Sequence, residues 1–351
     1  MAFIIGLRVD CRMDGRIVGS TGDPVAGHMP APRAAFAHPL MNIDNHRPRN
    51  SVSRCAIDAL AEPLRPPHHC RLRRADPMKE GEKFKRAVSW LREADGLLIT
   101  AGAGMGVDSG LPDFRGAQGF WRAYPPLKDH QLTFQDMANP RALASAPELY
   151  WGFYGHRLQL YRRTVPHRGF QILRRWAEAM PDGAAVFTSN VDGQFQKAGF
   201  HDGLVAECHG SIHMMQCSEL CSDAIWSAQA FEPIVDEAHC RLLGDVPACP
   251  HCGAIARPNI LMFGDFDWNA LRTQAQETRL YAWLASVKRL VVVEIGAGKT
   301  IPTVRHFSER VGSHIIRINP NDPGIAAYRG IGLAGGALET LELLNDSLSR
   351  G

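Results

Sequence analysis

A glycine-rich turn directly after a short apolar run is the feature of this chain that most constrains its fold. Residues 97–99 (Leu-Leu-Ile) are apolar and few enough for a buried strand, and the turn Ala101-Gly-Ala-Gly-Met-Gly106 follows them. Glycines let a backbone approach a pyrophosphate, and free N–H groups at a helix N-terminus neutralise its charge. Strand, glycine turn and helix start, in this order, predict a dinucleotide-binding crossover, although plain tight turns at strand exits also contain glycines.

Further apolar runs of strand length alternate with helical or loop segments along the chain. They lie at residues 184–188, 204–207, 290–295 and 314–318. Ahead of the first strand, Phe84, Ala87, Val88, Leu91 and Ala94 fall at helical spacing. The alternation predicts an α/β fold with a mostly parallel sheet and helices on both of its faces.

Residues 1–78 differ in composition from the rest of the chain. They hold eleven arginines and no lysine against seven acidic residues, together with nine of the 23 prolines, and show no period typical of a helix or a strand. We expect 1–78 to be a basic, largely disordered extension rich in Pro and Arg, because such a segment buries too little apolar surface to fold. It is either a non-functional extension, with Met78 as the natural start, or an Arg-rich targeting or nucleic-acid arm.

Charge, hydropathy and cysteine usage exclude several classes of protein. The formal net charge is only +3, which argues against a protein built to coat nucleic acid. No apolar run approaches the ~20 residues of a membrane span, and residues 1–9 make a poor secretory signal. An odd total of nine cysteines in such a chain indicates a reducing compartment, so we expect a cytoplasmic protein that associates with no membrane.

Four of the cysteines form two close pairs. Three residues separate Cys217 from Cys221, and two separate Cys249 from Cys252. Two pairs of thiolates suit a tetrahedral Zn²⁺ site, and four protein ligands leave no open position, so the site should be structural. Reduced thiols without metal, or a ligand set that includes Cys240, His239 or His251, are the alternatives.

Polar residues gather where two of the expected strands end. Thr188-Ser-Asn-Val-Asp-Gly193 follows one strand, and His209-Gly210 follows another. A histidine is mostly neutral near pH 7 and can serve as a general base, although most of the fifteen histidines are expected to be surface or packing residues. The acidic residues after the glycine turn come too early, and on a loop, to hold a ribose as in a dehydrogenase, which argues against hydride transfer.

Two further motifs are Ser109-Gly-Leu-Pro-Asp-Phe-Arg115 and Arg257-Pro-Asn-Ile-Leu-Met-Phe-Gly264. Together with the glycine turn, residues 188–192, His209-Gly210 and the cysteine pairs, they resemble the motifs that sirtuins carry in the same order. Sirtuins are NAD-dependent protein-lysine deacylases. The resemblance covers about residues 80–345. It implies a catalytic domain at 79–351 with a Rossmann-type doubly wound parallel sheet, and an inserted zinc-ribbon module at about 211–256. It also implies NAD as co-substrate, a structural Zn²⁺ and acyl-lysine proteins or peptides as substrates. The small net charge leads us to expect no direct binding of nucleic acid by the catalytic domain.

The resemblance also assigns roles to individual residues. His209 and Asn190 would be catalytic: the acyl oxygen of the substrate attacks the ribose carbon as nicotinamide leaves, and His209 takes a proton from a ribose hydroxyl so that this hydroxyl attacks the resulting imidate. Water then releases lysine and an acyl-ADP-ribose ester. The NAD-binding residues would be Gly102, Ala103, Gly104, Asp113, Phe114, Arg115, Ser189, Asn190, Val191, Asp192, Gly296, Ala297 and Asn319. The segment 259–263, with Ile260, Leu261 and Phe263, would pair with an extended substrate peptide by strand addition.

Three residues resemble those that mark the sirtuin subgroup that removes acidic acyl groups. Tyr154 and Arg157 are three apart and share a helix face, and Ala117 follows the Arg115-Gly116 pair. Arg157 would pair with the distal carboxylate of a succinyl or malonyl group, Tyr154 would donate a hydrogen bond, and Ala117 would leave room. The alternative is an ordinary amphipathic helix.

The chain departs from the family pattern at three places. Ser189 stands where most members carry Gln, Gly106 stands where Ser is usual, and Gly296-Ala-Gly298 replaces a Gly-Thr-Ser type of turn. Each change removes a polar side chain near the nucleotide. An NAD hydrolase or mono-ADP-ribosyltransferase on the same scaffold therefore remains an alternative, as does a non-catalytic NAD-sensing or chromatin-binding module.

Overall fold

The computed structural model describes residues 79–113 and 116–350. The predictions for the N-terminal extension, Phe114 and Arg115 lie outside the described residues, as does any statement about the side chain of Ala117.

The central element is a six-stranded sheet in which every neighbouring pair of strands is parallel. Its order is β11-β10-β9-β1-β2-β3, which is the order of a Rossmann-type sheet with its switch point between β1 and β9. The predicted doubly wound parallel sheet is therefore confirmed. The strands are β1 (Gly96–Ala101), β2 (Ala184–Thr188), β3 (Val205–Glu207), β9 (Leu290–Ile295), β10 (Ile315–Ile318) and β11 (Gly330–Leu333).

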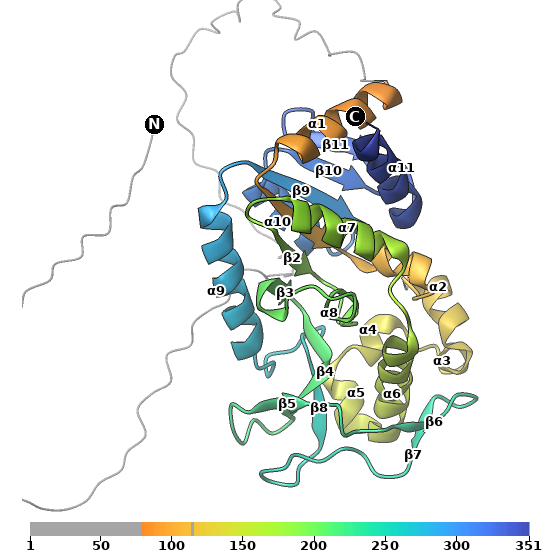
Figure 1. Cartoon of the computed structure of the whole chain (residues 1–351). Helices are drawn as coiled ribbons and strands as arrows, with labels where there is room; N and C mark the ends of the chain where they lie inside the picture. Colours follow the sequence, from red (N-terminus) through yellow and green to blue (C-terminus); the bar gives the residue numbers. More distant parts are fainter. Residues whose placement is uncertain (1–78, 114–115, 351) are drawn as a thin grey trace, which may run out of the picture. The chain divides into compact units, whose positions relative to one another are not determined.

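Helices cover both faces of this sheet, as Figure 1 shows. Because side chains alternate along a strand, Leu97 and Ile99 of β1 belong to one apolar layer and Leu98 to the other. The first layer is closed by α1 (Glu80–Glu93), α7 (Arg168–Ala179), α8 (Gln194–Lys197) and α11 (Ala337–Ser349). The second is closed by α9 (Leu271–Ser286) and α10 (Thr303–Val311).

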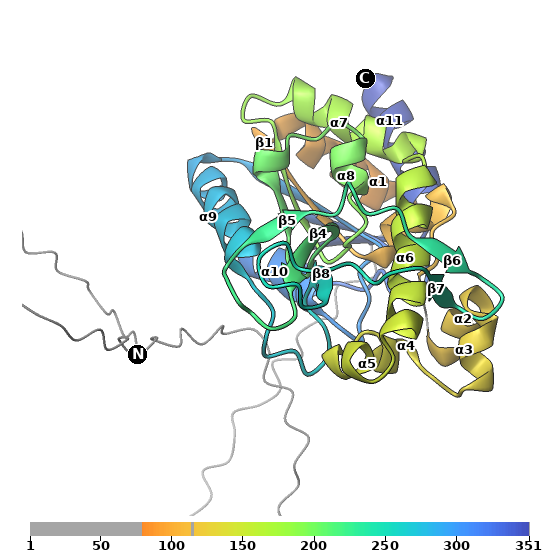
Figure 2. The ribbon, with the colours of Figure 1, turned by 90° about the horizontal axis from the view of Figure 1, so that it is seen from below.

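A second hydrophobic core lies beyond one end of the sheet (Figures 1 and 2). Five helices contribute to it: α2 (Gly116–Ala123), α3 (Pro125–Asp129), α4 (Phe134–Met137), α5 (Pro140–Ser145) and α6 (Pro147–Arg163). The antiparallel strands are β4 (Gly210–Cys217), β5 (Ile225–Ser227) and β8 (Ala256–Ile260) in one sheet, and β6 (Ile234–Asp236) and β7 (Arg241–Leu243) in another. The aromatic face of α6 fills the centre of this core with Tyr150, Trp151 and Phe153.

Two local features differ from the sequence-based expectation. The glycine turn continues as a 3₁₀ helix, η1 (Ala103–Ser109), which tightens the chain around Gly104 and Gly106. Strand β11 was not expected, because Gly-Ile-Gly-Leu is short and poor in strand formers. It forms because Gly330 lets the backbone approach β10 closely: a Cβ there would lie 2.1 Å from the Ile315 carbonyl oxygen. Among the helices that the structure describes, none is long and apolar enough to cross a membrane.

Candidate active site

Two glycine turns meet at the carboxyl ends of β1 and β9. The Gly104 N–H donates to the Gly296 carbonyl oxygen at 3.2 Å, and a Cβ on Gly102 would lie 2.8 Å from the same oxygen. Beside them is a cavity of about 120 Å³, lined in part by Gly104, Asp113 and Gly296. The sheet's switch point therefore carries a glycine-lined hollow, where nucleotides bind in such folds.

Asn190 joins the exit of β2 to the glycine turn. Its Nδ2 donates to the Gly102 carbonyl oxygen at 3.1 Å, and its backbone N–H donates to Thr188 Oγ1 at 3.0 Å. The Ser189 N–H donates to the carbonyl oxygen of Ala101 at 3.1 Å. The structure therefore brings Asn190, expected to line the nicotinamide pocket, next to Gly102, expected to hold the phosphates.

Asp192 is a buried carboxyl group in the same loop. Desolvation raises its pKa from 3.8 to about 6, against the hydrogen bond that Gln194 N–H donates to Oδ1 at 2.9 Å. The neighbouring Val191 is also buried, in the core that lines α6. A carboxyl group that is hard to ionise is typical of a functional pocket.

His209 follows β3 and is the most unusual titratable group of the site. Its Nε2 is buried and has no hydrogen-bond partner among the described residues. Burial lowers its pKa to about 4, and a hydrogen bond with the Ser189 backbone opposes the shift. The imidazole is therefore neutral at pH 7, and one ring nitrogen has no partner in the part of the chain that the structure describes.

The segment after β8 begins beside His209. Leu261 N–H donates to the His209 carbonyl oxygen at 3.0 Å, and Phe263 N–H donates to that of Ala138 at 2.9 Å. Met262 N–H donates to Asp265 Oδ2 at 3.2 Å. These three N–H groups have acceptors inside the protein, so a peptide strand added here would pair through carbonyl groups.

A buried ion pair fixes this segment, and the sequence did not reveal it. Arg257 donates to both carboxylate oxygens of Asp265, and its Nη2 also donates to the Ile260 carbonyl oxygen at 2.9 Å. Both side chains are almost fully buried. Its partner follows Arg257 eight residues later across a turn, a spacing that by itself indicates no contact.

Arg157 and Tyr154 lie together on α6, as their spacing predicted. The Arg157 guanidinium is buried and donates to Tyr161 Oη from Nε at 3.1 Å and from Nη2 at 2.9 Å. Its central carbon lies 5.2 Å from the ring centroid of Phe153 and 5.6 Å from that of Tyr154. The Tyr154 hydroxyl is buried without a partner among the described residues, and desolvation raises its pKa to about 12.

The four paired cysteines form one cluster. The Sγ atoms of Cys217, Cys221, Cys249 and Cys252 all lie within 4.8 Å of one another. The Cys217–Cys252 and Cys221–Cys249 sulfur distances are both 3.6 Å. Zn–S bonds of about 2.3 Å in a tetrahedron place sulfurs roughly 3.8 Å apart, so the cluster fits Zn²⁺.

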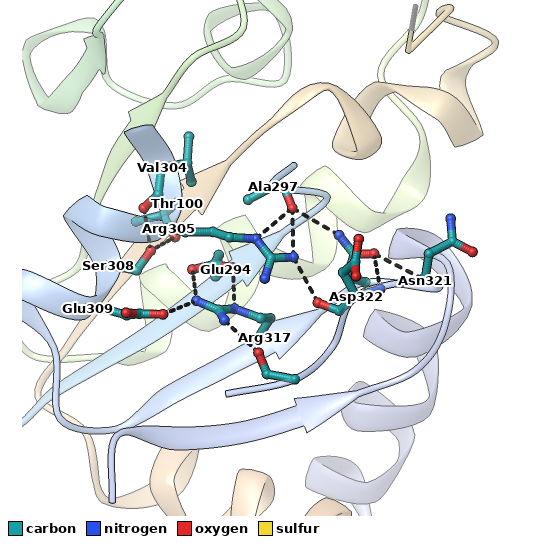
Figure 3. Close-up of polar contacts among 12 residues, drawn as sticks. Thr100, Glu294, Ala297, Val304, Arg305, Ser308, Glu309, Arg317, Asn321 and Asp322 are labelled. Atoms are coloured by element: carbon teal, nitrogen blue, oxygen red, sulfur yellow. Dashed lines mark hydrogen bonds and ion pairs between the residues drawn. The ribbon is translucent and has the colours of Figure 1, made fainter. Parts of the chain in front are cut away.

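Polar side chains hold the turn after β9 and the loop after β10 in place (Figure 3). Asn319, which was predicted to face the nucleotide, donates from Nδ2 to the Ala297 carbonyl oxygen at 3.0 Å and accepts the N–H groups of Asn321 and Asp322. Arg305 of α10 binds the same carbonyl oxygen. No spacing in the sequence indicates Arg305, because its burial arises from packing between distant loops.

Comparisons with known proteins agree with this geometry. The model of the Sir2 family matches residues 102–293. The NAD-dependent protein deacylase of Thermus thermophilus is 29% identical over 266 residues, which cover 75% of this chain and 94% of that protein. NAD-dependent protein deacylase 2 of Pyrobaculum aerophilum is 29% identical over 255 residues, covering 72% of this chain and 91% of that protein.

Solved structures share the fold. A Sir2 homologue in complex with NAD superposes with a TM-score of 0.58 at 22% identity, covering 76% of this chain and 94% of that one. A Sir2 protein bound to an acetylated peptide gives 0.55 at 18% identity, covering 77% of this chain and all of that one. With a family model matching more than half of its length, this chain belongs to the Sir2 family.

Proposed function

We propose that this chain is an NAD-dependent protein-lysine deacylase that releases nicotinamide and O-acyl-ADP-ribose. The observation that carries the proposal is His209, a neutral imidazole whose buried Nε2 has no partner among the described residues. Its ring forms a hydrogen bond with the backbone of Ser189, in the loop after β2 that would bind nicotinamide. Its carbonyl oxygen accepts the Leu261 N–H, in the segment after β8 that would bind the peptide. The curated relatives named above are NAD-dependent protein deacylases.

The residues present fit the dinucleotide. Close contact between the two glycine turns leaves a hollow that a Cβ at Gly104 would disrupt, since that atom would lie 2.6 Å from the Gly296 Cα. Gly102, Gly104 and Gly296 would hold the phosphates, and Asn190, Val191 and Asp192 would line the nicotinamide pocket. When bound, NAD supplies the electrophilic ribose carbon that accepts the acyl oxygen.

His209 would act as general base toward a ribose hydroxyl. A neutral imidazole accepts a proton without first stabilising a cationic sugar, as a carboxylate would. Burial holds the imidazole neutral throughout the physiological range, because its pKa is lowered to about 4. Asn190 would position the nicotinamide end through its hydrogen bond to the Gly102 carbonyl oxygen.

We further propose a preference for acidic acyl groups such as succinyl or malonyl. Arg157 is a buried cation, and the hydroxyl of Tyr154 is buried without a partner among the described residues. A carboxylate at the end of an acyl chain would accept hydrogen bonds from both groups in a site of low polarity. The aromatic rings around Arg157 exclude water and strengthen this interaction.

One assay separates the candidate activities. Nicotinamide release is followed with NAD alone, with an acetyl-lysine peptide and with a succinyl-lysine peptide of the same sequence. A deacylase releases nicotinamide only with acyl peptide, in equal amount to the free lysine formed. Free ADP-ribose or labelled protein without acyl peptide would instead identify a hydrolase or ADP-ribosyltransferase, and NAD binding without turnover would identify a sensor.

The acyl preference has its own test. Arg157→Met should lower kcat/KM for the succinyl peptide at least tenfold and change that for the acetyl peptide by less than threefold. Arg163→Met, at an exposed position on the same helix, is the matched control and should change neither. An enzyme that prefers acetyl peptides, with a preference that Arg157→Met leaves unchanged, would refute the acidic pocket.

We also propose a domain organisation and a location. The module at about 211–256 would be a separate zinc-binding unit inserted into the catalytic domain of 79–351. The paired free thiols suit a reducing compartment, for which we propose the cytoplasm.

A further inference from the structure

The turn after β9 is held by side chains from other elements. In this chain it reads Gly296-Ala-Gly298, so it has no hydroxyl group of its own. The Ala297 carbonyl oxygen accepts three hydrogen bonds: from Arg305 Nε at 3.0 Å, Arg305 Nη2 at 2.9 Å and Asn319 Nδ2 at 3.0 Å. One peptide group is thus fixed from two sides.

Arg305 also reaches the next loop (Figure 3). Its Nη2 donates to the Asp322 carbonyl oxygen at 2.8 Å, in the loop after β10. The cavity at the switch point is lined by Gly296 from the first loop, by Ile318 at the end of β10 and by Pro320 from the second loop. One guanidinium therefore ties together the two loops that form the adenosine side of the cavity.

This arrangement uses a charged group where apolar packing would stabilise more. Arg305 is buried, and desolvation together with the neighbouring Arg317 lowers its pKa. Arg317 forms ion pairs with Glu294 and Glu309, whereas Arg305 donates hydrogen bonds to backbone carbonyl oxygens. Burying a cation is unfavourable for stability. The benefit of Arg305 is that its planar guanidinium donates in fixed directions and so fixes the positions of the two loops.

We propose that Arg305 is a positioning residue for the adenosine half of NAD. The inference rests on the proposed use of NAD. Arg305 does not contact the nucleotide; it holds the 296–298 turn and the 319–322 loop at the separation that the nucleotide needs.

Direct binding measurements test this role. Isothermal titration with NAD and with ADP-ribose, which share the adenosine end, is carried out on the full chain and on Arg305→Met. The Kd for both ligands should rise at least tenfold, and KM for NAD should rise while KM for the acyl peptide stays within twofold. A folded Arg305→Met protein with an unchanged Kd for both ligands would overturn the proposal.

A second variant keeps the test decisive if Arg305→Met does not fold. Arg305→Lys retains the charge, but one ammonium group cannot donate to both loops in the same geometry, so it should also raise both Kd values. Binding equal to that of the original protein would show that charge alone is sufficient, and the positioning role would be wrong.

The matched control is Arg310→Met. Arg310 lies on the same helix, is exposed and donates to Tyr281 Oη, away from both loops, so both Kd values should stay unchanged. The two proposals fail separately. If the original protein binds neither ligand, the proposed function fails, whereas normal binding that Arg305 variants retain contradicts only the positioning role.

Discussion

The main chains of Gly104 and Gly296 are in contact, although Gly104 follows β1 and Gly296 follows β9. A Cβ on Gly296 would lie 2.4 Å from the Gly104 Cα, and Gly296 has a φ of +62°, in the left-handed region. Neither position accepts a side chain. The floor of the proposed nucleotide site is therefore a contact between two backbones.

Replacing Gly104 tests this contact. Gly104→Ala should displace the 296–298 turn, raise the Kd for NAD at least tenfold and destabilise the fold by roughly 1–3 kcal/mol, as overpacking does. Titration with NAD and urea unfolding measure the two effects. Gly81→Ala is the control and should leave NAD binding unchanged, because a Cβ there would meet no described residue beyond its own helical turn within 4 Å. An alanine at 104 that binds NAD normally would show that the two turns are not a rigid floor.

Removing the proposed base should stop catalysis without unfolding the protein. His209→Ala should lower kcat for deacylation by about 10²–10⁴, the usual contribution of a general base. Product formation is measured alongside circular dichroism, with the exposed His130→Ala as control. A folded His209→Ala enzyme with normal turnover would remove His209 from the mechanism.

The buried carboxyl group of Asp192 predicts a pH-dependent stability. Its native pKa is raised from 3.8 to about 6, so the native state favours the protonated form. The contribution of Asp192 to the free energy of unfolding is therefore fully present below about pH 4 and is lost as the pH rises through 6. Asp192→Asn should be more stable than the original protein by about 3 kcal/mol at pH 7.5, with no difference near pH 4.

Urea unfolding at both pH values measures this difference. The exposed Asp129→Asn should show no such pH-dependent gain. Equal stability of Asp192→Asn and the original protein at pH 7.5 would mean that Asp192 is ionised without cost in the native state.

Tyr154 has a buried hydroxyl that nothing in the described protein binds. Tyr154→Phe should leave stability unchanged or raise it by up to about 1 kcal/mol, because an unsatisfied polar group is removed. It should also lower kcat/KM for succinyl peptides more than for acetyl peptides. Tyr150→Phe, on the same helix with its hydroxyl bonded to Met262, should not shift the preference. Equal loss on both peptides would argue against a carboxylate-binding role.

The cysteine cluster predicts one structural zinc ion per chain. Cys217→Ser should reduce the zinc content to near zero and increase hydrogen exchange between residues 210 and 260, while β1 and β9 stay protected. Cys240→Ser should keep the zinc, since Cys240 lies outside the cluster. Zinc at one per chain after loss of Cys217 would require another ligand set.

The sequence determined much of the central sheet. Strands β1, β2 and β9 are runs of apolar residues buried on both faces, so their pattern is local and readable. The cysteine pairs were equally readable, because a tetrahedral Zn²⁺ site requires four ligands at close spacing. The roles given to the glycine turn and to His209 come from the family resemblance and stay predictions. The expected Tyr154–Arg157 neighbourhood followed from helical geometry alone.

Tertiary structure alone decided how these parts act together. Burial that lowers the pKa of His209 and raises that of Asp192 comes from segments distant in sequence. The Arg257–Asp265 pair and the contacts of Arg305 follow from how loops pack, and β11 exists because Gly330 fits against Ile315. Desolvation and close packing depend on what surrounds a residue in space, and residue type and spacing do not encode those surroundings.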